Sequence, residues 1–193
     1  MVETGKTRSR KGGAMKILSP EEIIDSFKTA IGNNLVDSSI FGQEVAIKAN
    51  LFTSISIVVK REAFRDAIKH ICELQEYPHF VVIASSDRGD NVELIYHISI
   101  YYGLHLKEIS LLLTVMLPKN DLKIPTITDI LPATIFAERE TQEMMGVEVT
   151  GIPDNRRLFL PDDFPSGVYP WRNDEAGLKP EMIRVLPGRE GIK

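Results

Sequence analysis

Cysteine is almost absent from this chain of 193 residues, and the scarcity limits its chemistry more than any other feature. The single cysteine, Cys72, cannot form a disulfide within the chain, and it cannot supply the four thiolates of an iron–sulfur cluster or a structural zinc site. No apolar run approaches about 18 residues, so the sequence predicts no membrane-spanning helix. The basic first segment, residues 1–18, also lacks the apolar stretch of a secretory signal. These absences are typical of a protein in a reducing compartment.

A strong excess of charge of one sign is missing too. The net charge is −4, which gives no indication of nucleic-acid binding. Hydrophobic residues make up 43% of the chain and charged residues 26%, so a core can form without disulfides or a structural metal. The length fits one domain with extensions. We therefore expect a basic N-terminal extension at 1–18, an α+β domain at 19–150 and an extended, partner-docking tail at 151–193.

Helical periodicity appears in three places. A capping box that begins at Ser19, followed by apolar residues at helical spacing, predicts a first helix that ends near Gly32. A second apolar stripe predicts a helix at residues 61–74. A third helix is expected at residues 133–145, where Gly146 provides a C-terminal stop.

Alternating or continuous apolar residues predict five strands. Residues 45–49 and 55–59 form the first pair, and the continuous apolar run at 79–86 indicates a strand covered on both faces. Two further strands are expected at 91–102 and 108–117. The order helix, strand, strand, helix, strand, strand, strand predicts a two-layer α+β fold with a mainly antiparallel sheet. A short helical region and the extended tail follow it.

Most motifs that could carry chemistry lack the context that their chemistry needs. The tetrapeptide TGKT at residues 4–7 looks like the end of a phosphate loop, but the earlier glycine and the preceding strand are missing. The tripeptide RGD at residues 88–90 lies between two predicted strands, where such residues form ordinary turns. The four histidines lack the spacing of a metal site. Cys72 lies beside the apolar stripe of the second helix and is expected to be a small buried side chain.

The densest charge cluster is FAERETQEMMG, residues 136–146. Its carboxylates could take part in acid–base catalysis, but on a helix Glu138 and Glu140 point in different directions and cannot form a dyad. Arg139 and Glu143 are neighbours at i and i+4 and predict an ion pair. The simplest interpretation is a solvated helix face with ordinary ion pairs. A small self-sufficient enzyme that uses one of these acids is the alternative.

The tail that follows is rich in proline and glycine, yet it also carries aromatic residues and arginines. Such side chains in a stiff, irregular segment are typical anchors of a partner surface. We therefore expect the charge cluster and the tail to form one interface. Its residues are Glu138, Arg139, Glu140, Glu143, Met145, Asp154, Arg156, Arg157, Phe159, Phe164, Tyr169, Trp171 and Arg172.

The stretch AERETQEMMGVEVTGIPDNRRLFLPDDFP, residues 137–165, resembles the signature of the NuoC-type, or thirty-kilodalton-type, subunit family of respiratory complex I. The matching elements are the E-R-E triplet with its following acid, apolar pair and glycine, and the later acid before an arginine pair. The ending LPDDFPSGVYPWRND is more similar to homologues in archaeal membrane-bound hydrogenases and sulfur-reducing complexes. Ile152 and Trp171 depart from the complex I pattern and favour these relatives.

The resemblance implies a noncatalytic, hydrophilic subunit of a membrane-bound, ion-pumping oxidoreductase. Such subunits carry no cofactor, and the iron–sulfur clusters belong to partner subunits. The implied partners are the hydrogenase-like large subunit and the adjacent iron–sulfur subunits. The implied location is the cytoplasmic side of the cell membrane, with the membrane reached only through the complex. Within the same resemblance, the alternative is the NuoC-type subunit of a true complex I, which oxidises NADH and reduces quinone.

Overall fold

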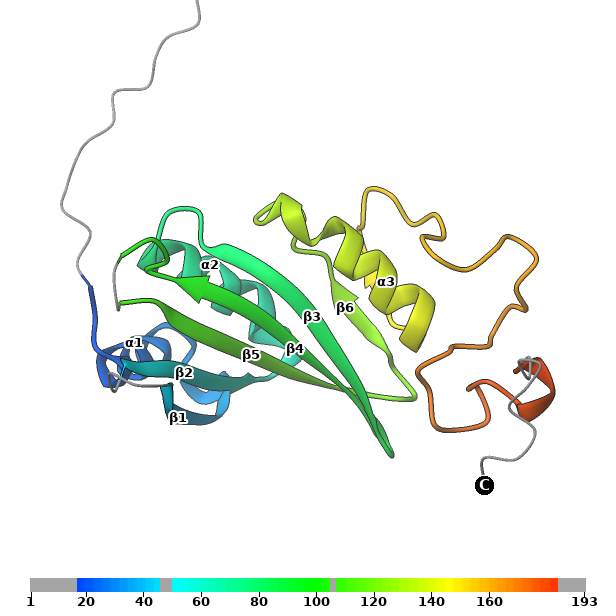
Figure 1. Cartoon of the computed structure of the whole chain (residues 1–193), viewed down its shortest axis with the longest axis horizontal. Coiled ribbons are helices and arrows are strands. Elements are labelled where there is room, and N and C mark those ends of the chain that lie inside the picture. Colours follow the sequence, from blue (N-terminus) through cyan, green and yellow to red (C-terminus); the bar gives the residue numbers. More distant parts are fainter. Residues whose placement is uncertain (1–16, 46–49, 105–106, 184–193) are drawn as a thin grey trace, which may run out of the picture.

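A five-stranded sheet forms the centre of the computed structural model, which describes residues 17–45, 50–104 and 107–183 (Figure 1). The strand order is β1-β2-β5-β4-β3. Within this sheet only β2 and β5 pair in parallel, and the other three pairs are antiparallel. The predicted α+β class with a mainly antiparallel sheet is therefore confirmed. The strands are β1 (Leu35–Val45), β2 (Asn50–Val59), β3 (His79–Arg88), β4 (Asn91–Ile100) and β5 (Ile109–Pro118).

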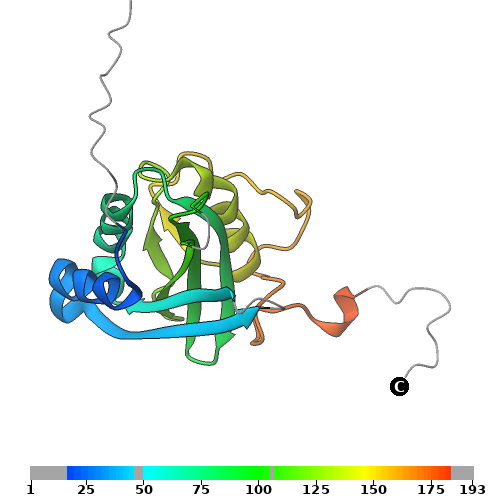
Figure 2. The same ribbon diagram turned by 60° about the vertical axis from the view of Figure 1, so that its left-hand side comes forward.

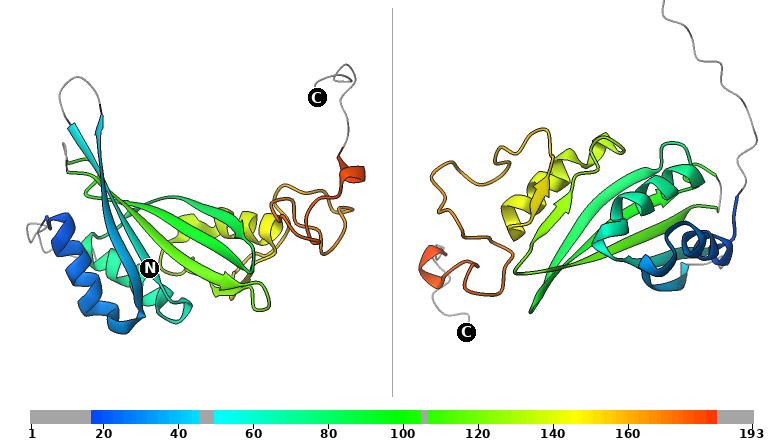
Figure 3. Two further views of the ribbon diagram at one scale, coloured as in Figure 1. Left: turned by 90° about the horizontal axis from the view of Figure 1, so that it is seen from below. Right: turned by 180° about the vertical axis from the view of Figure 1, so that it is seen from behind.

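Two helices, α1 (Pro20–Ile31) and α2 (Phe64–Leu74), lie on one face of this sheet, in front of it when the molecule is seen from behind (Figure 3). The predicted capping box begins α1. The Ser19 hydroxyl accepts a hydrogen bond from the Glu22 N–H at 3.2 Å, and the Glu22 carboxylate accepts one from the Ser19 N–H at 2.8 Å. The N-terminus of α1 is therefore fixed by its own sequence.

The hydrophobic core lies between these helices and the central strands β4 and β5. Every second residue of β4 is buried, as the alternation predicts: Val92, Leu94, Tyr96, Ile98 and Ile100. The Tyr96 ring packs against Phe64 of α2 with their centroids 4.7 Å apart. Complete burial of one such apolar side chain contributes about 1.5–3 kcal/mol to the free energy of unfolding.

The prediction that the strand at 79–86 is covered on both faces is wrong. This strand, β3, is an edge strand of the sheet, and Val81 and Val82 are exposed. Its register with β4 shifts between Phe80 and Val82, which is a bulge. A bulge at an edge strand disturbs the free hydrogen-bonding edge and protects it from pairing with another chain.

The first strand is also longer and earlier than the sequence predicted. β1 begins at Leu35, immediately after a 3-10 turn over Gly32–Asn34. It is the other edge strand, and its polar residues interrupt the alternation on which a sequence prediction depends. The predicted strand at 45–49 falls mostly on residues 46–49, which lie outside the described part of the chain.

A helix between two very short strands forms a second unit beside β3. The third helix, α3 (Ile135–Met145), follows a 3-10 turn at Pro132–Thr134 and ends at Gly146, which has the predicted left-handed conformation. Strands β6 (Lys123–Pro125) and β7 (Glu148–Thr150) flank α3 and pair in parallel. Figure 2 shows α3 and α1 toward opposite sides of the molecule. Three residues are too few to show alternation, so the sequence did not predict these strands.

The tail after residue 150 forms no strand in its described part, and it gathers at the C-terminal end of α3 (Figure 1). The RGD tripeptide forms the β3–β4 hairpin turn as expected, with Gly89 at a φ of +74°. The TGKT motif and most of the N-terminal extension lie outside the described residues. Among the helices that the structure describes, none is long and apolar enough to cross a bilayer.

Candidate functional site

The first acid of the charge cluster, Glu138, is completely buried, so the predicted solvated helix face is wrong at this position. Its carboxylate accepts hydrogen bonds from the Thr126 hydroxyl at 2.6 Å, the Ile127 N–H at 2.8 Å and the Thr134 hydroxyl at 3.4 Å. Burial raises the pKa of the Glu138 carboxyl, although these hydrogen bonds act in the opposite direction. Its charge also adds to the burial that raises the pKa of Tyr96. Glu138 therefore ties α3 to the segment after β6.

Arg139 is buried as well, and it holds the beginning of the tail. Its guanidinium donates to the backbone carbonyls of Arg156 and Arg157, both at 2.9 Å, and lies 3.3 Å from the Asp154 carboxylate. These partners replace the predicted ion pair with Glu143. Hydrogen bonds from Arg156, together with the charge of Arg139, lower the pKa of Asp154 far below its ordinary value.

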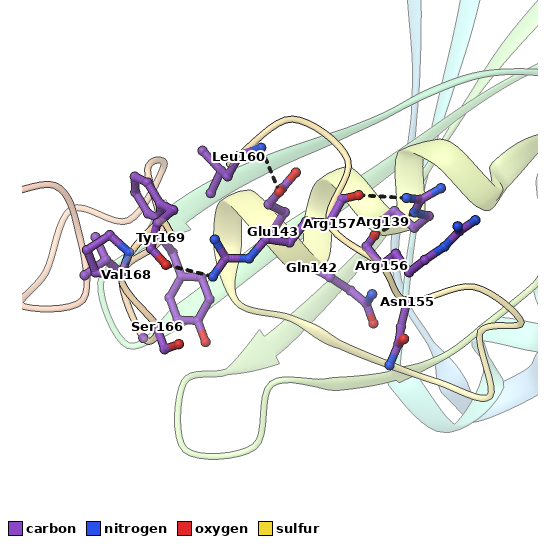
Figure 4. A pocket seen from close by; sticks show the side chains of 13 residues that line it. Arg139, Gln142, Glu143, Asn155, Arg156, Arg157, Leu160, Ser166, Val168 and Tyr169 are labelled. Atoms are coloured by element: carbon purple, nitrogen blue, oxygen red, sulfur yellow. Dashed lines mark hydrogen bonds between the residues drawn. The ribbon is translucent and has the colours of Figure 1, made fainter. Parts of the chain in front are cut away.

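Glu143 holds the next stretch of the tail. Its carboxylate accepts the backbone N–H groups of Leu158, Phe159 and Leu160, with the two shortest bonds at 2.8 Å. Three consecutive N–H groups that converge on one carboxylate form an anion nest, here occupied by a side chain of the same molecule. Figure 4 shows Glu143 facing Leu160 and Arg139 facing Arg157. Arg139 and Glu143, one helical turn apart, therefore fix residues 154–160 alongside α3.

The end of α3 is capped by a later part of the tail. The Trp171 N–H donates to the Met144 carbonyl at 3.0 Å, and the Arg172 guanidinium reaches the Met145 carbonyl at 3.4 Å. The last carbonyls of a helix have no partner within the helix, so these bonds satisfy groups that would otherwise need water. The Tyr169 ring lies directly over Gly146.

We predict that Gly146→Ala destabilises the chain more than Gly89→Ala does. Both glycines have a φ near +75°, so the backbone strain is similar at the two positions, roughly 1 kcal/mol. A methyl group at Gly146 would lie 2.6 Å from the Tyr169 ring, whereas one at Gly89 would meet nothing within 4 Å. We expect at least about 1 kcal/mol of additional loss from this overpacking, measured by urea unfolding. Equal losses would show that Tyr169 moves aside without cost.

A partly buried charge cluster connects the tail to the sheet. The Asp87 side chain, at the end of β3, is 2% exposed, and the Lys119 ammonium lies 2.7 Å from it. Lys119 also lies 2.6 Å from Asp174, and Asp174 in turn binds Arg172. The Asn173 N–H donates to Asp87 at 2.8 Å. These contacts place the tail beside the β3–β4 hairpin, and we call them the hairpin latch.

Between the tail and α3 lies a hollow of about 270 Å³. Its wall carries Arg139, Gln142 and Glu143 on one side and tail residues that include Tyr169 on the other (Figure 4). The guanidinium of Arg157 donates to the carbonyls of Pro161 and Phe164, which closes a loop of the tail beside this hollow. The charged side chains that bound the hollow, which are Arg139, Glu143, Arg156 and Arg157, therefore already have partners within the chain.

The structure brings nearly all predicted interface residues together, but in two different roles. Inward-facing residues join α3 to the tail and include Glu138, Arg139, Glu143, Met145, Asp154, Tyr169 and Arg172. Outward-facing residues are Phe159, Trp171 and Arg156, while Phe164 is half-buried under Arg157. Glu140 is half-buried, and its side chain makes no hydrogen bond or ion pair to another described residue. No sequence pattern indicated Asp87 and Lys119, because both lie in turn-like stretches far from the charge cluster.

The site offers no evident catalytic or metal-binding constellation in the part of the chain that the structure describes. No three His, Cys, Asp or Glu side chains there are placed to hold a metal ion. A row of Ser26, His70 and Glu73 joins α1 to α2, with 2.8 Å between the Ser26 hydroxyl and His70. The Ser26 hydroxyl lies 2.6 Å from the Ile23 carbonyl, which can only accept. His70 must therefore donate to Ser26, which is the reverse of what a general base does.

Comparison with known proteins gives consistent results. The family model described as "Respiratory-chain NADH dehydrogenase, 30 Kd subunit" matches residues 57–181. The chain is 38% identical to "Membrane-bound hydrogenase subunit beta" of Pyrococcus furiosus over 143 residues, which are 73% of this chain and 82% of that protein. It is 29% identical to "Hydrogenase-4 component G" of Escherichia coli over 132 residues, 66% of this chain but only 23% of that protein.

A solved structure shares the fold. It is described as the structure of the membrane-bound sulfane sulfur reductase, an archaeal respiratory membrane complex. The match has a TM-score of 0.59 at 20% identity and covers 79% of this chain and 82% of that one. At 20% identity, this match shows a similar arrangement of helices and strands and nothing further.

Proposed function

Because the chain belongs to the respiratory-chain NADH dehydrogenase 30 kDa subunit family, we propose that it is a noncatalytic subunit that docks on the hydrogenase-like large subunit of a membrane-bound oxidoreductase. The type of complex we propose is a membrane-bound hydrogenase or a sulfane sulfur reductase. In it the chain would be a peripheral part of the cytoplasmic arm, next to subunits that carry iron–sulfur clusters.

One observation carries this proposal: the charged residues that could have formed an active site are used to shape a surface. Glu138, Arg139 and Glu143 all bind groups of their own chain, and the result is a fixed tail with exposed aromatic side chains. General acid–base catalysis needs a group that can reach a substrate, and these three have their hydrogen bonds inside the fold. A fixed aromatic surface is what a docking subunit needs.

The relatives support the choice of complex. The Pyrococcus protein, named as a subunit of a membrane-bound hydrogenase, is matched over most of its length. In the Escherichia coli relative the matching region is less than a quarter of a much longer protein, so there a module like this chain is joined to further protein. Both arrangements fit a chain that works in contact with others.

The proposal is tested by capture of the chain on an affinity-tagged large subunit expressed in the same cells. We expect the chain at a one-to-one ratio with the large subunit. We also expect iron and flavin analysis of the isolated chain to find neither in a stoichiometric amount, with oxidoreductase activity only in the assembled complex. Capture no better than background, or activity of the chain alone, would contradict the proposal.

A further inference from the structure

We propose that Phe159 and Trp171, with the acidic side chains of Asp162, Asp163 and Glu175, form a docking surface for an apolar hollow rimmed by lysine and arginine on the large subunit. The inference rests on the proposed function and specifies the chemistry of the surface that this chain meets. It also separates this outer surface from the charged residues that shape it.

Most charges of the signature are not available to a partner. Arg139 is held by two carbonyls and Asp154, Glu143 by three N–H groups, and Arg172 by Asp174 and the end of α3. A partner could use these groups only by breaking bonds that fix the tail. The residues that meet the partner must therefore be sought among those that the tail turns outward.

Two large aromatic residues are turned outward at fixed points. Phe159 and Trp171 are 61% and 42% exposed. Their backbone N–H groups bind the Glu143 carboxylate and the Met144 carbonyl, which belong to adjacent residues in the last turn of α3. Both aromatics are thus attached to one rigid element, so little conformational entropy is lost when they enter a partner surface. Exposed aromatics with fixed backbones are typical anchors of protein interfaces.

The acids beside these aromatics have no partners among the described residues. Asp162 and Asp163 follow Phe159 closely in the chain, Glu175 follows Trp171, and all three are exposed. Two cations of this region already have partners, because Arg156 binds Asp154 and Arg157 donates to two carbonyls, whereas Lys179 is exposed. Among the side chains of the described tail without a partner, acids therefore outnumber Lys179, and the surface is apolar at its anchors with an excess of acids beside them. Electrostatic complementarity requires positive charge on the matching rim.

The test uses the full-length chain and the complex purified from cells that lack this chain. Two double variants address the two parts of the surface: Phe159→Ala with Trp171→Ala removes the anchors, and Asp162→Lys with Asp163→Lys reverses the rim charge. We expect the first to bind at least about tenfold more weakly, as for hot-spot anchors. We expect the second to associate about tenfold more slowly at low salt, and added salt to reduce this difference.

Matched controls lie on other surfaces of the chain. Phe41→Ala removes an aromatic side chain that is 55% exposed on the edge strand β1. Glu62→Lys with Glu76→Lys reverses two exposed acids near the ends of α2. We expect both controls to bind like the wild type. Circular dichroism melts of every variant establish that the fold is retained.

The outcomes separate this inference from the proposed function. If the wild type does not bind the complex, the proposed function fails. If the wild type binds but the anchor variant binds equally well, the surface is wrong and the proposed function stands. If the rim variant associates as fast as the wild type, or faster, at low salt, the positive rim is wrong. A loss that is as large in the control variants also overturns the inference.

Discussion

Replacing Glu143 by glutamine releases residues 158–160 from α3, whereas the same change at Glu140 leaves them in place. The Glu143 carboxylate accepts three backbone N–H groups, and a glutamine offers one acceptor oxygen together with an amide group that can only donate. Hydrogen bonds to a charged group contribute about 1.5–3 kcal/mol each to stability. We expect a net loss of about 2–3 kcal/mol for Glu143→Gln after partial solvation of the freed groups.

Hydrogen exchange is the direct measurement, because it reports the opening of individual amides. The amides of Phe159 and Leu160 should exchange faster by a factor of about 30 to 100 in Glu143→Gln. Glu140→Gln is the matched control, since Glu140 lies on the same helix and its side chain has no hydrogen bond to another described residue. Unchanged exchange at Phe159 in the Glu143 variant would show that the tail is held by packing alone.

Replacing Asp87 by asparagine opens the hairpin latch. The carboxylate of Asp87 faces the Lys119 ammonium and accepts the Asn173 N–H. An asparagine keeps an oxygen that can accept but loses the charge, while Lys119 keeps its contact with Asp174. We therefore expect a loss of about 1–2 kcal/mol, the contribution of a hydrogen bond to a charged group. Asp90→Asn, an exposed position in the same hairpin turn, is the control and should change the free energy of unfolding by less than about 0.5 kcal/mol.

The same latch gives the tail a dependence on pH. Burial opposes ionisation of Asp87. Its hydrogen bonds with Lys119 and Asn173 nevertheless lower the pKa of the Asp87 carboxyl in the folded chain below its ordinary value. Hydrogen bonds from Arg172 and Lys119 lower the pKa of Asp174 much further. A lowered pKa means that the stabilisation is complete above the ordinary value of about 4 and is lost as the pH falls through the folded value. We expect the wild type to lose stability below about pH 4 more steeply than Asp87→Asn. Parallel pH profiles in urea unfolding would contradict this assignment.

The sequence predicted the fold well where a single face of an element is buried. Alternation in β4 and the helical stripes of α1 and α2 follow directly from packing against one core, so their period is visible. The prediction failed at β3 because an apolar run is the same whether a strand is central or at an edge. Only the pairing of strands decides which it is, and pairing is not local in sequence.

The structure brings most residues of the candidate site together around α3, but the direction of their side chains was not predictable from the sequence. The spacing of i and i+4 identifies only neighbours on one helix, and from it we predicted an ion pair between Arg139 and Glu143. In the fold Arg139 finds stronger partners at Arg156 and Arg157, 17 and 18 residues later. Because the sequence of the tail has no periodicity, it does not indicate which element of the fold the tail packs against. The burial of Glu138 and the role of Asp87 therefore required the structure.

The hairpin latch has a consequence for the order in which the chain folds. Its bond between Asp87 and Asn173 closes a loop of 86 residues, so the latch cannot form until the sheet, α3 and the tail have all been synthesised. Contacts between residues so far apart in sequence form late, because the chain must first lose the conformational entropy of closing the loop between them. A translation product that ends before Asn173 therefore cannot make this bond between the tail and the β3–β4 hairpin. The latch makes synthesis of the tail up to this residue a condition for holding it against the sheet.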